Sequence, residues 1–337
     1  MEAKRYFKDI SPRVWEHPAD RAAMTALKQL PFLGDVIKKL LGLTTEKSLR
    51  LLALSSYVRV SEKQFPRIHK MNKEASEILD IQPAPEIYVS QNPFLNAGAV
   101  GVDKPFVSLN SAMLKTLNDD ELLGVIGHEL GHIKSGHVLY KTVLWLLVNV
   151  SAAVLNGIPQ LAIMAIVMAL REWDRKSELS ADRAGLLVLQ ELNPSVSILM
   201  KLAGGSDIGE MSLEEFFIQA EEYEAGGDLL DSAFKILNLL NQTHPFPVIR
   251  LKELKTWHDS GAYQAILDGK YDHATGEKPD PFADIKNAGD NFREEMKKSK
   301  DPLTSIINDI GDKMETAGKN VTGQLDDLFN SIFGKKK

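Results

Sequence analysis

Apolar residues recur at helical spacing between charged residues through positions 20–80, a pattern that predicts several amphipathic helices. These apolar positions include Leu27, Leu30, Val36, Ile37, Leu40 and Leu41. After Pro83 and Pro85 the pattern changes to short segments rich in β-branched and aromatic residues, EIYVS and NAGAVGVDKPFVSLN. Gly98 and Gly101 in the second segment predict a hairpin or a bulged edge strand. The sequence therefore predicts an α+β fold that is mainly helical, with one small sheet.

Two long helices are predicted in the middle of the chain. Asn118 and Glu121 have the spacing of a capping box, and the HELGH segment at 128–132 follows in a stretch that continues to Val150 without a proline. A second helix is predicted from near Pro159 until just before Pro194. Together they predict a long helical hairpin, and further helices are expected over residues 210–268.

Composition excludes some classes of function. The 337 residues are 44% hydrophobic and 26% charged, which is typical of a globular protein. Forty basic and 46 acidic residues give a formal charge of -6, which provides no electrostatic basis for binding nucleic acid. The N-terminus lacks the apolar core of a secretory signal, so cytoplasmic residence is expected. Because cysteine is absent, a zinc site would have to use His, Asp and Glu.

The HELGH segment supplies two metal ligands and a base. His128 and His132 are four residues apart, so on a helix both imidazoles face one zinc ion. Glu129 projects beside the metal, where it can accept a proton from a zinc-bound water. The bare HExxH pattern occurs by chance in roughly one chain in a hundred of this size, so it needs independent support.

Glu178 is the predicted third ligand. A hairpin turning at residues 156–157 places His132 24 residues before the turn and Glu178 21 residues after it. The arms are then roughly 36 and 32 Å long, which returns Glu178 to the level of HELGH. Asp182 lies one turn further along and could orient a ligand histidine. His137 does not fit as a ligand, and we interpret it as a residue supporting a ligand or as merely structural, with the structural role favoured.

These residues resemble a branch of the gluzincins, the zinc endopeptidases typified by HtpX and the CAAX prenyl proteases. The resemblance covers roughly residues 50–255 and includes four segments besides HELGH: NAGAVG with Asn96, Ala97 and Gly101, the helix entry at 120–122, ELSADRAG at 178–185 and THPFPVIR at 243–250. Unlike those relatives, this chain shows no clear N-terminal membrane span.

The resemblance implies one Zn²⁺ per chain and hydrolysis of protein or peptide substrates by metal-activated water. It further implies that an edge strand around Asn96, Ala97 and Gly98 pairs with extended substrate. By the same resemblance His244 stabilises the oxyanion and Arg250 has a supporting polar role. The expected domains are a helical scaffold at 1–80, a metallopeptidase domain at 81–270, a linker at 271–300 and an amphipathic tail at 301–337.

Two segments of the sequence carry apolar surface that other atoms must shield from water. Residues 142–170 contain no charge, yet two membrane crossings need about 40 apolar residues, so we predict the apolar tip of the hairpin and not a transmembrane segment. Burial within the protein is favoured over contact with another subunit or a shallow membrane contact. Residues 303–333 have apolar positions at spacings of three or four, which predicts helices that dock on the protein, self-associate or lie on a lipid surface.

Two other functions are compatible with a zinc site. An aminopeptidase would need an acidic pocket for the substrate amine, and the sequence identifies none. A zinc-stabilised adaptor or chaperone-like interaction protein would act through the apolar hairpin tip and the tail. Glu129 disfavours the adaptor, because a structural zinc needs no base and is closed by four protein ligands.

Overall fold

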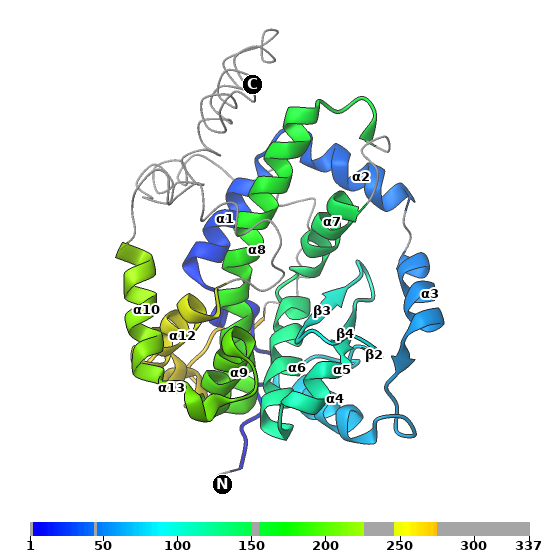
Figure 1. Ribbon diagram of the computed structural model, residues 1–337. Helices are drawn as coiled ribbons and strands as arrows, with labels where there is room; N and C mark the ends of the chain where they lie inside the picture. The colour runs from blue at the N-terminus through cyan, green and yellow to red at the C-terminus, as the bar shows by residue number, and fades with distance from the viewer. Residues whose placement is uncertain (1–2, 44–45, 150–154, 226–245, 275–337) are drawn as a thin grey trace.

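Helices dominate the computed structural model, which describes residues 3–43, 46–149, 155–225 and 246–274 (Figure 1). The α-helices are α1 (Pro18–Lys28), α2 (Leu33–Leu43), α3 (Glu46–Ser56), α4 (Pro66–Ile78), α5 (Ser111–Thr116), α6 (Asp119–Lys134), α7 (Val138–Asn149), α8 (Gln160–Leu189), α9 (Leu192–Gly204), α10 (Leu213–Ala225), α12 (Pro247–Asp259) and α13 (Ala262–Leu267). The prediction of a mainly helical α+β fold is confirmed. The predicted tail at 303–333 lies outside the described residues.

One four-stranded sheet lies beside the helices, with strand order β1-β2-β4-β3. Its strands are β1 (Val58–Arg59), β2 (Ile87–Ser90), β3 (Ala97–Val100) and β4 (Phe106–Asn110). The predicted hairpin is β3 and β4, which pair antiparallel, while β2 and β4 run parallel. The sequence did not predict β1, a two-residue strand antiparallel to β2, since so short a segment shows no alternation. The order places β3 at an edge of the sheet.

The two faces of the sheet pack on different helices, because successive side chains of a strand point to opposite sides. Ile87 and Val107 face the main core, which contains residues of α4, α6, α8 and α9. Tyr88 and Phe106 lie on the other face, against Leu49 of α3. The sheet is therefore fixed from both sides, which holds the edge strand β3 beside α6.

Helix α6 begins as predicted and ends earlier than predicted. The backbone N–H of Glu121 donates to Asn118 Oδ1 at 2.9 Å and the N–H of Asn118 donates to Glu121 Oε2 at 2.8 Å, which confirms the capping box. The expectation of one continuous helix through HELGH and beyond is wrong, because α6 ends at Lys134 and α7 starts at Val138.

A Schellman turn causes this break. Gly136 adopts φ +73°, its N–H donates to Ile133 O at 3.1 Å, and the N–H of His137 donates to His132 O at 3.0 Å. A continuous helix would place the side chain of His137 on a different face from that of His132. The turn instead brings the two imidazoles together, with ring centroids 5.3 Å apart.

Helices α6 and α8 approach unusually closely along a line of glycines. Gly124, Gly127 and Gly131 share one face of α6, and a Cβ added at any of them would lie within 3.0 Å of a side-chain atom of α8. At Gly131 the clash would be with Ala184 Cβ, at 2.5 Å. This approach brings Glu178 of α8 to the histidines of α6.

Helix α8 also ends earlier than predicted. It stops at Leu189, and α9 begins at Leu192, so Pro194 lies in the first turn of a further helix. Proline is tolerated there because the first N–H groups of a helix have no partner within it. The proline marks a helix start where the sequence suggested a helix end.

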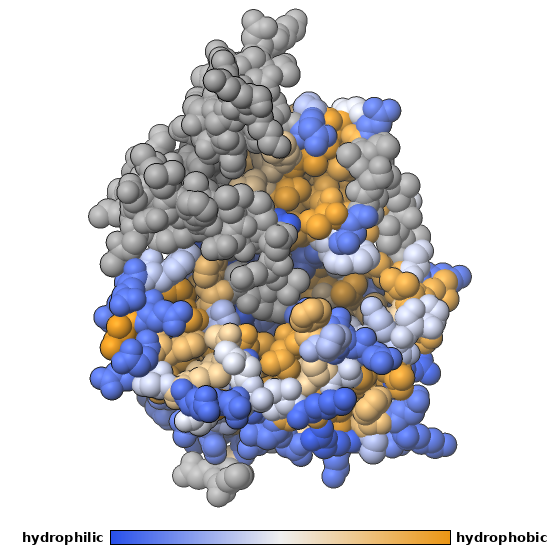
Figure 2. Space-filling view, viewed as in Figure 1, coloured by the Kyte–Doolittle hydropathy of each residue, from blue (hydrophilic) through white to orange (hydrophobic). Residues whose placement is uncertain are grey.

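The described parts of the apolar hairpin tip, 142–149 and 155–170, share a buried cluster with the N-terminal helices. Val143, Leu146 and Ile166 share a buried cluster with Val36 and Leu40 of α2. Figure 2 shows that apolar surface also remains on this face, over α7 and α8. The exposed large apolar residues of these two helices are Trp145, Val148 and Met164. Within the described part of the chain, no helix is both long and apolar enough for a membrane crossing.

Candidate metal centre

Helices α6 and α8 bring three potential metal ligands together. One ligand atom each of His128, His132 and Glu178 lies within 4.8 Å of the other two, and all three side chains are buried. Glu178 Oε1 is 3.1 Å from His132 Nε2, and Glu178 Oε2 is 3.4 Å from His128 Nε2. The Nε2 atoms of both rings therefore face the same carboxylate. Two imidazole nitrogens and one carboxylate oxygen form the donor set of a catalytic zinc site.

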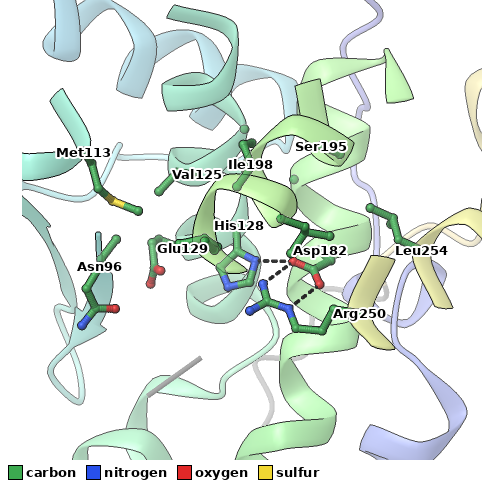
Figure 3. Close-up of a pocket in the computed structure, with 15 residues that line it drawn as sticks. Asn96, Met113, Val125, His128, Glu129, Asp182, Ser195, Ile198, Arg250 and Leu254 are labelled. Carbon is green, nitrogen blue, oxygen red and sulfur yellow. Dashed lines mark hydrogen bonds and ion pairs between the residues drawn. The ribbon is translucent and has the colours of Figure 1, made fainter. Parts of the chain in front are cut away.

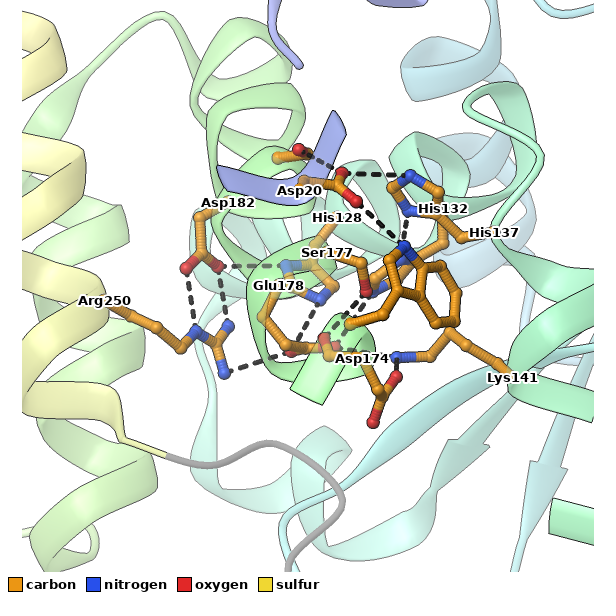
Figure 4. Close-up of polar contacts among 12 residues, drawn as sticks. Asp20, His128, His132, His137, Lys141, Asp174, Ser177, Glu178, Asp182 and Arg250 are labelled. Atoms are coloured by element: carbon orange, nitrogen blue, oxygen red, sulfur yellow. Dashed lines mark hydrogen bonds and ion pairs between the residues drawn. The ribbon is translucent and has the colours of Figure 1, made fainter. Parts of the chain in front are cut away.

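A carboxylate and a guanidinium orient His128 from its other side. Asp182 Oδ1 lies 3.0 Å from His128 Nδ1. Arg250, from α12, donates to the same carboxylate through Nε at 2.8 Å and Nη2 at 2.6 Å, while its Nη1 lies 3.2 Å from Glu178 Oε2 (Figure 4). Two-point contact with a planar guanidinium fixes the carboxylate plane, and the carboxylate in turn fixes the imidazole.

His132 is held differently, through a second imidazole. Its Nδ1 lies 3.0 Å from His137 Nδ1, and His137 Nε2 lies 3.2 Å from Asp20 Oδ2 in α1. The Asp20 carboxylate is buried and also accepts from Ser180 Oγ at 2.5 Å and from Trp173 Nε1 at 3.0 Å. The sequence reasoning missed Asp20, since nothing in the spacing links a residue of the first helix to HELGH.

A lysine whose side chain is 12% exposed contacts the third ligand. Lys141 Nζ donates to Glu178 Oε1 at 2.8 Å and to Asp174 Oδ1 at 2.6 Å. Lys141 was also missed, although the sequence holds a signal for it: it is the last charge before the 29 uncharged residues, on a helix that must return beside the acidic residues of α8. Glu178 thus contacts cations on both sides, Lys141 and Arg250.

Burial and these charges shift the pKa values of the buried groups. Burial lowers the pKa of His128, but the carboxylates of Asp182 and Glu178 outweigh it and raise this pKa to about 9. His132 shifts the other way, because burial and the nearby Lys141 ammonium lower its pKa well below the ordinary value. For Asp182, burial would raise the pKa, yet Arg250 and His128 hold it below the usual range.

Glu129 lines a pocket beside the histidines. The pocket runs between α6, α9 and α12 to the start of β3, and its large apolar lining residues are Met113, Val125, Ile198, Leu199, Leu202 and Leu254. His128, Glu129 and Asn96 border it, with the Glu129 carboxylate between the other two in Figure 3. Glu129 is 1% exposed, and its Oε2 has no hydrogen-bond partner among the residues that the structure describes. A carboxylate so placed can exchange protons with a group bound in the pocket.

The remaining predicted residues are only partly placed. Asn96 and Ala97 line the pocket, and Gly98 follows in edge strand β3. Arg250, to which the resemblance assigns a supporting polar role, is buried against Asp182. His244 lies outside the described residues, so its predicted role stays a prediction.

Comparison with known proteins gives consistent matches. The model of the family described as peptidase family M48 matches residues 62–258. The chain is 34% identical over 266 residues to the plastoglobule-localized metallopeptidase 48, chloroplastic, of Arabidopsis thaliana, which covers 77% of each protein. It is 31% identical over 147 residues to a protease HtpX homolog of Thermococcus kodakarensis, covering 43% of this chain and 48% of that protein. No solved structure matches the chain.

Proposed function

The chain belongs to peptidase family M48, and from this premise we propose that it is a zinc-dependent endopeptidase with His128, His132 and Glu178 as ligands. The observation that carries the proposal is the convergence of these three buried side chains next to a pocket whose wall contains His128 and the buried carboxylate of Glu129. Family membership supports a metalloprotease acting on proteins or peptides. The choice of zinc and of internal cleavage is our inference.

The residues present fit zinc. The site has nitrogen and oxygen donors only, both Nε2 atoms face Glu178, and both Nδ1 atoms are engaged on the opposite side by Asp182 and His137. Three protein ligands leave a coordination position for water, as catalytic zinc sites require. When bound, zinc supplies Lewis acid chemistry, lowering the pKa of a coordinated water and polarising the substrate carbonyl.

The chain's own residues then perform the proton transfers. Glu129 accepts the proton of the attacking water on its buried carboxylate and later donates it to the leaving amine. The Oε2 atom of Glu129, which has no partner in the described part of the chain, supplies this capacity. Asp182 and Arg250 keep the His128 ring in position during these steps. A buried pocket wall excludes bulk water and strengthens these interactions.

Substrate binding is assigned to the edge strand and the pocket. An extended peptide adds to a sheet edge through main-chain hydrogen bonds, and β3 is the edge strand beside the pocket. Asn96, Ala97 and Gly98 are proposed to contact it. The large apolar side chains of the lining would receive an apolar substrate side chain. For His244 we retain the proposal of oxyanion stabilisation, which rests on the family resemblance alone.

The cellular location of the protein, its contact with membranes and its self-association are also proposals. Cytoplasmic residence stays a proposal, and contact with a membrane surface or self-association is proposed only through 142–170 and 303–333. The relative named as plastoglobule-localized makes localisation to plastoglobules the first alternative to examine.

The test compares two glutamates of one helix. Glu129→Gln should keep bound zinc and abolish cleavage of an unfolded protein such as casein, because an amide cannot accept the proton. Glu121→Gln makes the same change at the buried capping-box residue two turns away and should keep both zinc and turnover. Zinc content is measured by mass spectrometry of the metal, and cleavage with and without chelator. Undiminished cleavage by Glu129→Gln would refute the proposal, and new internal peptide ends would exclude an aminopeptidase.

A further inference from the structure

We propose that Asp20 and His137 are positioning residues of the metal centre, which fix His132 in the tautomer that presents Nε2 to the metal. This proposal rests on the proposed function only in using zinc as the metal that probes the site. The hydrogen-bond chain that carries it is independent of any peptidase activity. It runs from the Asp20 carboxylate through the His137 ring to His132, and every member is buried (Figure 4).

The direction of each hydrogen bond follows from what each atom can donate. A neutral His132 that binds a metal through Nε2 must carry its proton on Nδ1. That N–H points at His137 Nδ1, 3.0 Å away, so His137 Nδ1 must accept and the His137 proton must be on Nε2. His137 Nε2–H then donates to Asp20 Oδ2, at 3.2 Å. This arrangement requires a hydrogen-bond acceptor next to His137 Nε2. An ionised carboxylate such as that of Asp20 accepts hydrogen bonds and donates none.

The surroundings of Asp20 keep it ionised and correctly oriented. Trp173 Nε1, which can only donate, binds Oδ1 at 3.0 Å, and Ser180 Oγ lies 2.5 Å from Oδ2. Burial by itself would raise the pKa of Asp20, but His137 and these two hydrogen-bond partners hold it below the ordinary value. The carboxylate therefore serves His137 as a fixed acceptor.

Each ligand histidine is thus connected to a carboxylate, one by a single hydrogen bond and the other by two. Asp182 contacts His128 directly, whereas Asp20 reaches His132 through His137. The longer route exists because the turn at Gly136 folds His137 back onto His132. Asp20 lies in α1, before the segment matched by the family model, so the N-terminal helix completes a centre whose ligands all lie inside that segment.

The first test uses the unmodified, full-length protein. Nitrogen-15 NMR of the histidine rings, recorded on the zinc-loaded chain, distinguishes a protonated from an unprotonated ring nitrogen. We expect His132 to be protonated on Nδ1, and His137 on Nε2 and not on Nδ1. A proton on His137 Nδ1 would overturn the proposal, because His132 Nδ1 would then face a donor.

The second test reverses the direction of the hydrogen bonds that link positions 20, 137 and 132. In Asp20→Asn the amide must present its oxygen to the Trp173 N–H and its NH₂ to His137, because Trp173 cannot accept. His137 then becomes protonated on Nδ1, and the proton of His132 is driven to the metal-facing Nε2. We expect zinc affinity, measured by competition with a chelating dye, to fall about 10–100-fold, the usual effect of losing a residue that orients a metal ligand.

Trp173→Phe provides the rescue. Without the indole N–H, the amide introduced at position 20 in the Asp20→Asn/Trp173→Phe double variant can turn its oxygen to His137. Zinc affinity should therefore return toward that of Trp173→Phe alone. A merely structural role for Asp20 predicts the opposite, since the double variant loses more core interactions than either single variant. Failure of this rescue would overturn the tautomer argument.

Glu121→Gln is the matched control for loss of a buried carboxylate. It should leave zinc affinity unchanged while lowering stability, because Glu121 pairs with Lys201 at 2.8 Å, far along α6 from the ligands. A chain that binds zinc as described and cleaves no protein would refute the proposed function and leave the positioning role intact. Wild-type zinc affinity in a folded Asp20→Asn variant would refute the positioning role alone.

Discussion

Substituting Gly131 by alanine should separate α6 from α8 and disrupt the metal centre. The new Cβ would lie 2.5 Å from Ala184 Cβ, whereas ordinary contacts begin at 3.4 Å. The helices must therefore part by about 0.9 Å at this level, because both clashing atoms are fixed to backbone. Metal–ligand distances tolerate deviations of only about 0.2 Å. Glu178 moves with α8, so it can no longer keep its distance to both histidines.

Stability and zinc affinity should respond together. Overpacking costs about 1–3 kcal/mol and the higher helix propensity of alanine returns up to about 1 kcal/mol, so we expect a net loss of up to about 3 kcal/mol. Zinc affinity should fall on the order of tenfold to a hundredfold. Urea unfolding in chelator measures the first quantity, and competition with a zinc-binding dye measures the second.

Gly34→Ala is the matched control for this substitution. Gly34 also lies in a helix, α2, and a Cβ added there meets nothing within 4 Å. This variant should gain up to about 1 kcal/mol and bind zinc normally. If Gly131→Ala were as stable as Gly34→Ala and bound zinc like the wild type, the close approach of α6 and α8 would not be what positions Glu178.

Three further predictions concern charges. Glu178→Ala should lose most of the bound zinc, measured by metal analysis after dialysis, since two histidines alone hold the metal weakly; full retention would exclude Glu178 as a ligand. Lys141→Met should destabilise the metal-free protein by about 3–5 kcal/mol, because Asp174 and Glu178 lose their shared cation. Zinc should then raise the melting temperature more than in the wild type, and an equal or smaller rise would contradict this. Although burial would raise the pKa of Glu121, Lys201 and Ser197 hold it below 4.5, so its contribution is present above that pH and is lost as pH falls through the lower, folded-state pKa. Acid unfolding curves of Glu121→Gln should lack this component, and coincident curves would refute it.

Local spacing predicted the parts of the centre that local geometry determines. The four-residue separation of His128 and His132 and the capping box at Asn118 both depend on one turn of helix, and both are found in the structure. Glu178 was predicted from the lengths of the hairpin arms although the first arm breaks at Gly136. Glu178 lies beside the histidines because α7 still packs alongside α8. The break at Gly136 therefore changes the direction of the first arm more than its length.

Other features depend on contacts that no spacing encodes. The glycine at 136 is compatible with a helix interior at modest cost, so only the αL conformation in the structure shows that the helix ends there. In the sequence Asp20 is an acidic residue of the first helical turn of α1, a common position for an acidic residue. Its role depends on the packing of α1 against α8. The domain boundaries at 80, 270 and 300 stay predictions. The contact of Val36 and Leu40 with the hairpin tip nevertheless shows that the N-terminal helices share a core with the described parts of 142–170.

The Arg250 contacts also bear on how the protein is made. Synthesis proceeds from the N-terminus, so α1 leaves the ribosome first, α6 and α8 follow, and α12 emerges only after residue 259. Until then Asp182 and Glu178 lack the guanidinium that joins them. A nascent or prematurely terminated chain therefore has the HELGH segment without the centre that surrounds it. The set of contacts around Asp182 and Glu178 is therefore complete only when nearly the whole described chain has folded.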